Sequence, residues 1–223
     1  MRLSEGVITN HNRHHLPTDK MLKKTLISLA ALAIAASASA EFRWGPAAGI
    51  NISNMRWKQK LLQTNTLVGP QAGLMGEIMI PGIGFGIDLA LKYSVNGSTL
   101  HFGEHEVWAA DGIGTTKVWV HQLQIPLNLR FKWTRMEGVE QYIAPFVYGG
   151  PVFNFNIATT DCPAIEHPAA SFALQCGIGA ELFEHWQISG GYLWGFSYEL
   201  RTIKLDNFSA SQRGWQINLA YLF

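Results

Sequence analysis

The residue types best suited to chemistry gather between residues 96 and 117, in a stretch with two histidines and three carboxylates. They are His101, Glu104, His105, Glu106 and Asp111. Imidazole and carboxylate groups can ligate zinc, or can supply the base and its orienting partner for hydrolysis. The spacing His-x-x-x-His brings two ligands together only on a helix, which Phe102 and Gly103 do not favour. A hydrated polar loop is the favoured interpretation, and surface hydrolysis stays open as the alternative.

The chain carries none of the short patterns that identify common catalytic sites. Gly-x-Ser-x-Gly, His-Glu-x-x-His and a glycine-rich nucleotide-binding loop are absent from the sequence. We therefore predict no catalytic residue, no metal ion and no cofactor. The net charge of +1 and the charged fraction of 15% give no electrostatic basis for a nucleic-acid partner.

The first forty residues resemble a targeting sequence and not a folded domain. Residues 21–24 are a basic start, residues 25–36 are apolar, and Ala38-Ser39-Ala40 fits a cleavage site. This order is typical of a secretory signal peptide, and the apolar run is shorter than the roughly 20 residues of a membrane-spanning helix. We predict a signal peptide at residues 21–40, cleaved near Ala40-Glu41. Residues 1–20 are interpreted as an extension upstream of the true start or as a long n-region.

Residues 41–223 form a series of segments in which apolar and polar residues alternate. In the clearest segment, Phe85, Ile87 and Leu89 alternate with Gly86 and Asp88. This period of two predicts β-strands with one apolar and one polar face. Eight strands are predicted: Phe42–Trp57, Leu67–Ile80, Ile83–Val95, Val118–Thr134, Gln141–Ile157, Ser171–Phe183, Trp186–Glu199 and Gln212–Phe223. The fifth is apolar on both faces, so its orientation stays unassigned.

The connections between the predicted strands alternate between long and short. The short ones are 81–82, 135–140 and 184–185, and the long ones are 58–66, 96–117, 158–170 and 200–211. An even strand number with this alternation is typical of barrels with long outer loops and short periplasmic turns. We predict an all-β fold, an eight-stranded antiparallel up-and-down transmembrane β-barrel in the outer membrane. A soluble periplasmic barrel with an apolar ligand inside stays open, because a period of two does not say which face points inward.

Aromatic residues lie near the predicted strand ends, where membrane barrels carry interfacial girdles. They are Trp57, Trp119, Trp133, Tyr142, Trp186, Tyr198 and Tyr221. The last strand alternates up to an aromatic carboxyl terminus. There, Tyr221 and Phe223 look like the sorting signal that the barrel-assembly machinery recognises. This strand must pair with Phe42–Trp57, because closure removes both sheet edges.

Charged residues of both signs lie on the face that a membrane barrel turns inward. The predicted lumen cluster is Glu77, Asp88, Lys92, Arg130, Lys132 and Glu181. An eight-stranded barrel is only wide enough for its own side chains, and buried charges need partners. We therefore predict a structural role, in which these groups satisfy one another and plug the lumen. An ion pathway or a proton-linked site is the alternative.

The two cysteines, Cys162 and Cys176, lie in the third long loop and in the middle of the sixth strand. Export permits a disulfide, but their Cα atoms would have to lie within about 7 Å. The mid-strand position of Cys176 argues against the bond.

Several segments resemble the PorT-like outer-membrane β-barrel family. They are Gly45–Asn54, Gly84–Ser94, Ile125–Leu129, Gly179–Leu182 and Gly191-Tyr192, and they cover the mature chain in order. The resemblance implies an outer-membrane barrel and does not imply a defined activity.

The predicted function is a non-enzymatic structural or surface-interaction barrel in the outer membrane. Its expected partners are outer-membrane lipid, the barrel-assembly machinery and an extracellular or envelope protein that binds the outer loops. An outer-membrane enzyme that modifies lipid or peptide at these loops is the alternative, together with the soluble barrel described above.

Overall fold

The computed structural model describes residues 41–57, 63–80, 82–102, 114–134, 138–162, 165–202 and 209–223. The predicted signal peptide and the upstream extension lie outside the described residues. Every described residue belongs to one compact unit, Ala40–Phe223.

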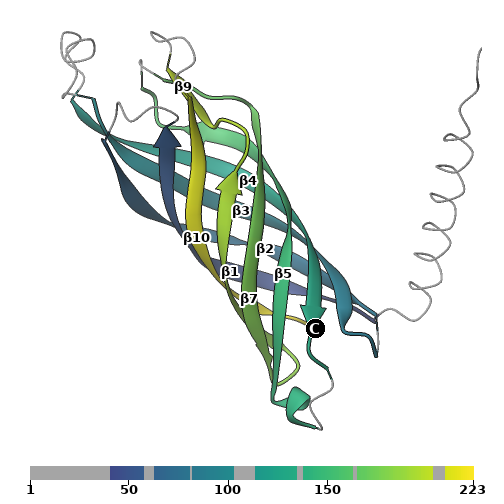
Figure 1. The fold of residues 1–223 in the computed structure, drawn as a ribbon. Coiled ribbons are helices and arrows are strands. Elements are labelled where there is room, and N and C mark those ends of the chain that lie inside the picture. Colours follow the sequence, from purple (N-terminus) through teal and green to yellow (C-terminus); the bar gives the residue numbers. More distant parts are fainter. Residues whose placement is uncertain are drawn as a thin grey trace, which may run out of the picture. The chain divides into compact units, whose positions relative to one another are not determined.

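Eight long antiparallel strands form a closed barrel (Figure 1). Each pairs with the next along the chain, and the last pairs with the first over Ala47–Trp57 and Ala210–Ala220. The strands are β1 (Glu41–Trp57), β2 (Gln63–Met79), β3 (Phe85–His101), β4 (Thr115–Lys132), β5 (Ile143–Thr159), β7 (Ala170–Leu182), β8 (Trp186–Gly195) and β10 (Ser209–Tyr221). The predicted fold class is confirmed.

Two short strands and one short helix complete the described structure. β6 (Ile165–Glu166) pairs with β9 (Leu200–Thr202), and β9 pairs with β10. The 3-10 helix η1 (Val139–Gln141) lies between β4 and β5. The described residues contain no helix that is long and apolar enough to cross a membrane. We call the end that carries the chain terminus Phe223 and the short connections the turn end, and the opposite end, with β6 and β9, the loop end.

Side chains alternate across the barrel wall as the sequence predicts for a membrane barrel. On β3, Phe85, Ile87 and Leu89 point outward and are exposed, whereas Asp88 and Lys92 point inward and are buried. The alternative of a soluble barrel with an apolar interior is therefore wrong. From Phe85 to Val95 the apolar face rises about 25 Å, at about 3.4 Å per residue and a tilt of about 40°. This height matches the apolar band of outer-membrane barrels.

Aromatic side chains gather on the outer wall towards both ends. Phe223 contacts Trp44 and Tyr221 near the turn end, and Tyr192 contacts Trp194 and Trp215 nearer the loop end. The predicted girdle position is wrong for Trp57, which is buried. Trp57 points inward because it lies on the inward parity of β1, next to the outward residue Arg56.

The structure resolves the orientation of β5, which the sequence leaves open. Phe146 and Tyr148 point into the barrel, where they lie against glycines of β7 and β8. A Cβ atom on Gly177 would lie 2.6 Å from the Tyr148 ring, and one on Gly191 would lie 2.5 Å from its hydroxyl. The inward glycines therefore make room for two inward aromatic rings.

Several predicted strand ends are wrong at the loop end. β3 continues to His101 instead of ending at Val95, β4 begins at Thr115 instead of Val118, and β8 ends at Gly195 instead of Glu199. The polar run after Val95 resembles a loop in composition. It is a strand because its backbone pairs with β4 and, from Ser98 onward, with β2.

Closure is testable by cross-linking across the β1–β10 seam. Ile50 faces Ile217 in the register of this pair. In a Cys176→Ala background, the double variant Ile50→Cys and Ile217→Cys should form a disulfide on mild oxidation, because facing Cα atoms in an antiparallel pair lie about 4.5–5.5 Å apart. A mobility shift on non-reducing gels measures it. The matched pair Ile50→Cys and Ile188→Cys, on non-adjacent strands, should stay reduced, and equal cross-linking of both pairs would contradict closure.

Candidate functional site: the filled barrel interior

Near the turn end the interior holds an ion-pair network centred on Glu77. The Glu77 carboxylate accepts hydrogen bonds from Arg43 Nη2 at 2.7 Å, from Lys132 Nζ at 2.9 Å and from Arg130 Nη1. Glu181 shares two of these cations, at 2.7 Å from Arg43 and 2.8 Å from Lys132. These residues come from four strands, β1, β2, β4 and β7. The network therefore ties strands together across the lumen.

Arg130 connects further groups to this network. Its Nε donates to Asp88 at 2.8 Å, its Nη1 donates to Gln187 at 2.8 Å, and its guanidinium lies 4.0 Å from the centroid of the Phe146 ring. A cation over an aromatic face is attracted by the ring quadrupole.

The charges of the network cancel. It contains three cations (Arg43, Arg130, Lys132) and three carboxylates (Glu77, Asp88, Glu181). Removing one partner would leave an uncompensated buried charge, so the network persists only as a whole.

The structure brings together five of the six predicted lumen residues: Glu77, Asp88, Arg130, Lys132 and Glu181. Lys92 lies apart, buried, and its Nζ donates to Asn218 at 3.0 Å. The predicted cluster left out Gln187, which donates to both Glu77 and Glu181. Its inward parity on β8 was the only sequence signal for this role.

Amide side chains fill the middle of the barrel. Gln71 donates to Asn218 at 2.6 Å, and Gln175 donates to Asn128 at 2.8 Å. Asn51 donates to the Ser94 hydroxyl at 2.5 Å. Uncharged amides can donate and accept, so each can satisfy neighbours on more than one strand.

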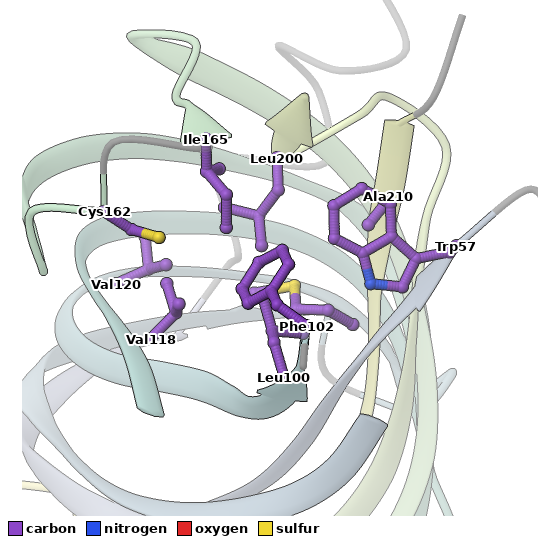
Figure 2. Packing of buried hydrophobic residues seen from close by; sticks show 10 residues of the cluster. Trp57, Leu100, Phe102, Val118, Val120, Cys162, Ile165, Leu200 and Ala210 are labelled. Carbon is purple, nitrogen blue, oxygen red and sulfur yellow. The ribbon is translucent and has the colours of Figure 1, made fainter. Parts of the chain in front are cut away.

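Towards the loop end the interior becomes apolar (Figure 2). Ten buried residues form this loop-end cluster: Met55, Trp57, Leu100, Phe102, Val118, Val120, Cys162, Ile165, Leu200 and Ala210. The cluster was not predicted. The available signal was the inward parity of apolar residues at the far ends of β1, β3 and β4.

The cluster lies between two parts of the sheet that separate at this end. Pairing of β1 with β2 stops at Ser53 and Leu67, and pairing of β5 with β7 stops at Phe155 and Ala170. Beyond these points β2, β3, β4 and β5 stay paired, as do β1, β10, β9 and β6. Because each part contributes residues to one cluster, the loop end is a small two-layered sheet packing that covers the lumen.

Of the predicted chemical residues in the long second connection, the structure places only His101. Its ring lies at the end of β3, with Asn65 Nδ2 and Thr115 Oγ1 each 3.1 Å from one of its nitrogens. Glu104, His105, Glu106 and Asp111 lie outside the described residues. Within the described ranges, no group of three His, Cys, Asp or Glu residues could hold a metal ion.

Both cysteines are free thiols. Cys162 is buried in the loop-end cluster, whereas Cys176 points outward from β7. No disulfide joins them, because the two side chains lie on opposite sides of the barrel wall.

The chain terminus is fixed in the turn-end aromatic girdle. The Phe223 amide donates to the Trp44 carbonyl at 2.9 Å, and its ring lies 5.1 Å from that of Tyr221.

Substituting the central carboxylate tests the network. Glu77→Gln keeps the side-chain shape but leaves three cations with two carboxylates, so we expect a loss of about 3–5 kcal/mol in unfolding free energy. The urea midpoint in micelles, followed by the gel mobility difference between folded and unfolded barrel, measures it. Glu41→Gln, at an exposed rim position, is the control, and equal midpoints for both variants would contradict the role of the network.

A family model for the outer membrane protein beta-barrel domain matches residues 34–201. No curated protein matches the chain. Among solved structures, the chain is similar to the outer membrane protein OprG of Pseudomonas aeruginosa, with 14% identity, a TM-score of 0.46, and coverage of 82% of this chain and 95% of that one. It is also similar to a major outer membrane protein of Thermus thermophilus, with 15% identity, a TM-score of 0.46, and coverage of 83% of this chain and 100% of that one. The third similar structure is the attachment invasion locus protein Ail of Yersinia pestis, with 13% identity, a TM-score of 0.42, and coverage of 82% of this chain and 99% of that one.

The family match covers most of the chain, and the closed barrel has an apolar outer wall and a polar interior. The chain therefore belongs to the outer membrane protein β-barrel domain family and is an integral β-barrel protein of the outer membrane.

Proposed function

We propose that this protein is a non-enzymatic, non-conducting barrel whose loop end interacts with other molecules at the cell surface. The observation that carries the proposal is the filling of the interior by ion pairs, then amides, then the loop-end cluster. Eight strands enclose a lumen that side chains can fill, so no through-pore is expected. The exposed loop end on a rigid scaffold is then the part available for recognition.

The proposal also includes the PorT-like family and the carboxyl-terminal sorting signal. We place the chain among PorT-like barrels on the strength of the segments Gly45–Asn54 and Gly84–Ser94, which fall in and next to β1 and β3. Tyr221 and Phe223 would be read by the barrel-assembly machinery after export by the signal peptide. The alternative of a lipid- or peptide-modifying enzyme rests on residues of which only His101 is described.

Planar bilayer recording tests the absence of a pore. The purified barrel should add no ohmic conductance steps under conditions in which a porin inserted by the same procedure conducts, because the described side chains fill the lumen. Insertion is confirmed by protease-resistant, heat-modifiable protein recovered from the bilayer lipid. Steady steps whose frequency rises with added protein would contradict the plugged lumen.

Surface labelling tests the orientation of the barrel. Short turns face the periplasm in barrels of this type. In a Cys176→Ala background, Arg201→Cys on β9 should react with an impermeant maleimide on intact cells. Glu184→Cys at the turn end should react only after permeabilisation. Both positions are exposed, so the reverse pattern would contradict a loop end that faces the outside.

A further inference from the structure

Glu199 is a buried carboxylate that has no cationic partner among the described residues. It lies between the spanning strand β8 and the short strand β9, is 1% exposed, and points into the barrel. Gln122 Nε2 on β4 donates to it, as does Ser171 Oγ on β7 at 3.1 Å. Each of the three carboxylates in the turn-end network, by contrast, meets a guanidinium or an ammonium group.

Gln212, the other described hydrogen-bond partner of the Glu199 carboxylate, is also neutral. The amide of Gln212 on β10, turned so that its nitrogen faces the carboxylate, donates at 3.0 and 3.2 Å, while its oxygen accepts from Asn96 on β3 at 3.0 Å. Turned the other way, the same amide oxygen can accept a hydrogen bond from the O–H of a protonated Glu199. The surroundings therefore suit either protonation state of Glu199.

One further titratable group comes near Glu199. His167, between β6 and β7, lies against the Glu199 backbone, and burial lowers the pKa of this imidazole while Asp161 opposes the shift. Burial, against the hydrogen bonds from Gln122 and Ser171, raises the pKa of Glu199 to about 7.

The position of Glu199 couples its charge to the cover of the lumen. Its backbone N–H donates to the Ala210 carbonyl at 2.8 Å, and the next residue, Leu200, belongs to the loop-end cluster. β9 in turn pairs with β6 and β10. A charged Glu199 that moves towards water would therefore pull β9 away from both partners.

We propose that Glu199 is a proton-binding site that regulates the loop end, holding the β6–β9 cover closed when protonated and loosening it when ionised. A carboxylate whose pKa is higher in the closed state than in the open state stabilises closure below its ordinary pKa, and this stabilisation is lost as pH rises through the closed-state value. The pKa of Glu199 is 4.5 when the group is in water, as in the open state, and about 7 in the closed state. The ratio of closed to open molecules should therefore fall roughly 70-fold between pH 5 and pH 8. The protonation of His167 affects closure in the opposite direction, because a pKa lowered in the closed state destabilises closure as the solution becomes acidic.

Trypsin cleavage after Arg201 on β9 measures the opening, because this strand must leave its neighbours before a protease can bind it. The wild-type barrel in micelles is compared with Glu199→Gln at each pH, so the pH dependence of trypsin cancels in the ratio of rates. We expect the wild-type rate relative to the variant to rise roughly 70-fold from pH 5 to pH 8. Glu166→Gln, an exposed carboxylate on β6, should keep the wild-type profile, and His167→Gln should keep the rise.

A constant ratio of wild-type to Glu199→Gln rates, or the same rise in that variant, would overturn the proposal. If Glu199→Gln does not fold, infrared difference spectroscopy of the wild-type protein reads the carboxyl group directly. A protonated carboxyl band that is present at pH 5 and lost by pH 8, in step with the rise in cleavage, supports the proposal. Cleavage that rises with no change in this band refutes it.

Discussion

In the hydrocarbon of a membrane, a backbone N–H or C=O without a protein partner costs several kcal/mol, and the pairing of β1 with β10 removes the last sheet edges from that environment. The rest of the molecule follows from this closure. Eight strands give a barrel too narrow for a water channel, so side chains must fill the interior. Those side chains come from every strand, and groups far apart in the chain, such as Arg43 and Glu181, meet only because the sheet curls back on itself.

The outer face of each long strand meets lipid along the membrane band and water nearer the loop end. Within the membrane band, β3 exposes Leu89 and Leu91 outward and buries Asp88 and Lys92 inward. Nearer the loop end the pattern inverts, because Leu100 points inward into an apolar cluster while the outward residue His101 hydrogen-bonds to polar neighbours. The inversion occurs because the outward face leaves lipid and meets water, where an ordinary apolar core is again the favourable arrangement. The two kinds of interior are thus stacked in one barrel.

Period-two alternation predicted the strand number and the inward position of five network residues, because these depend on local parity. The even strand number and the alternating connection lengths predicted the antiparallel closure. Alternation failed where the outcome depends on distant partners. The two apolar faces of β5 become intelligible only when Phe146 and Tyr148 meet glycines of β7 and β8. The residue type of Trp57 predicts a girdle position, whereas its inward parity at the loop end, where the interior is apolar, buries it. The strands β6 and β9 are too short to carry any periodic signal.

The pairing of β6 with β9 joins two loops that are separated by two membrane-spanning strands. The surface at this end is therefore a composite, in which residues near 165 and residues near 201 lie side by side. A linear peptide copied from either loop would lack half of that surface, so an antibody raised against such a peptide would meet only part of its epitope on the folded protein. Because β6 and β9 are paired, a substitution in one loop would change the contacts of the other. The two loops would therefore have to vary together.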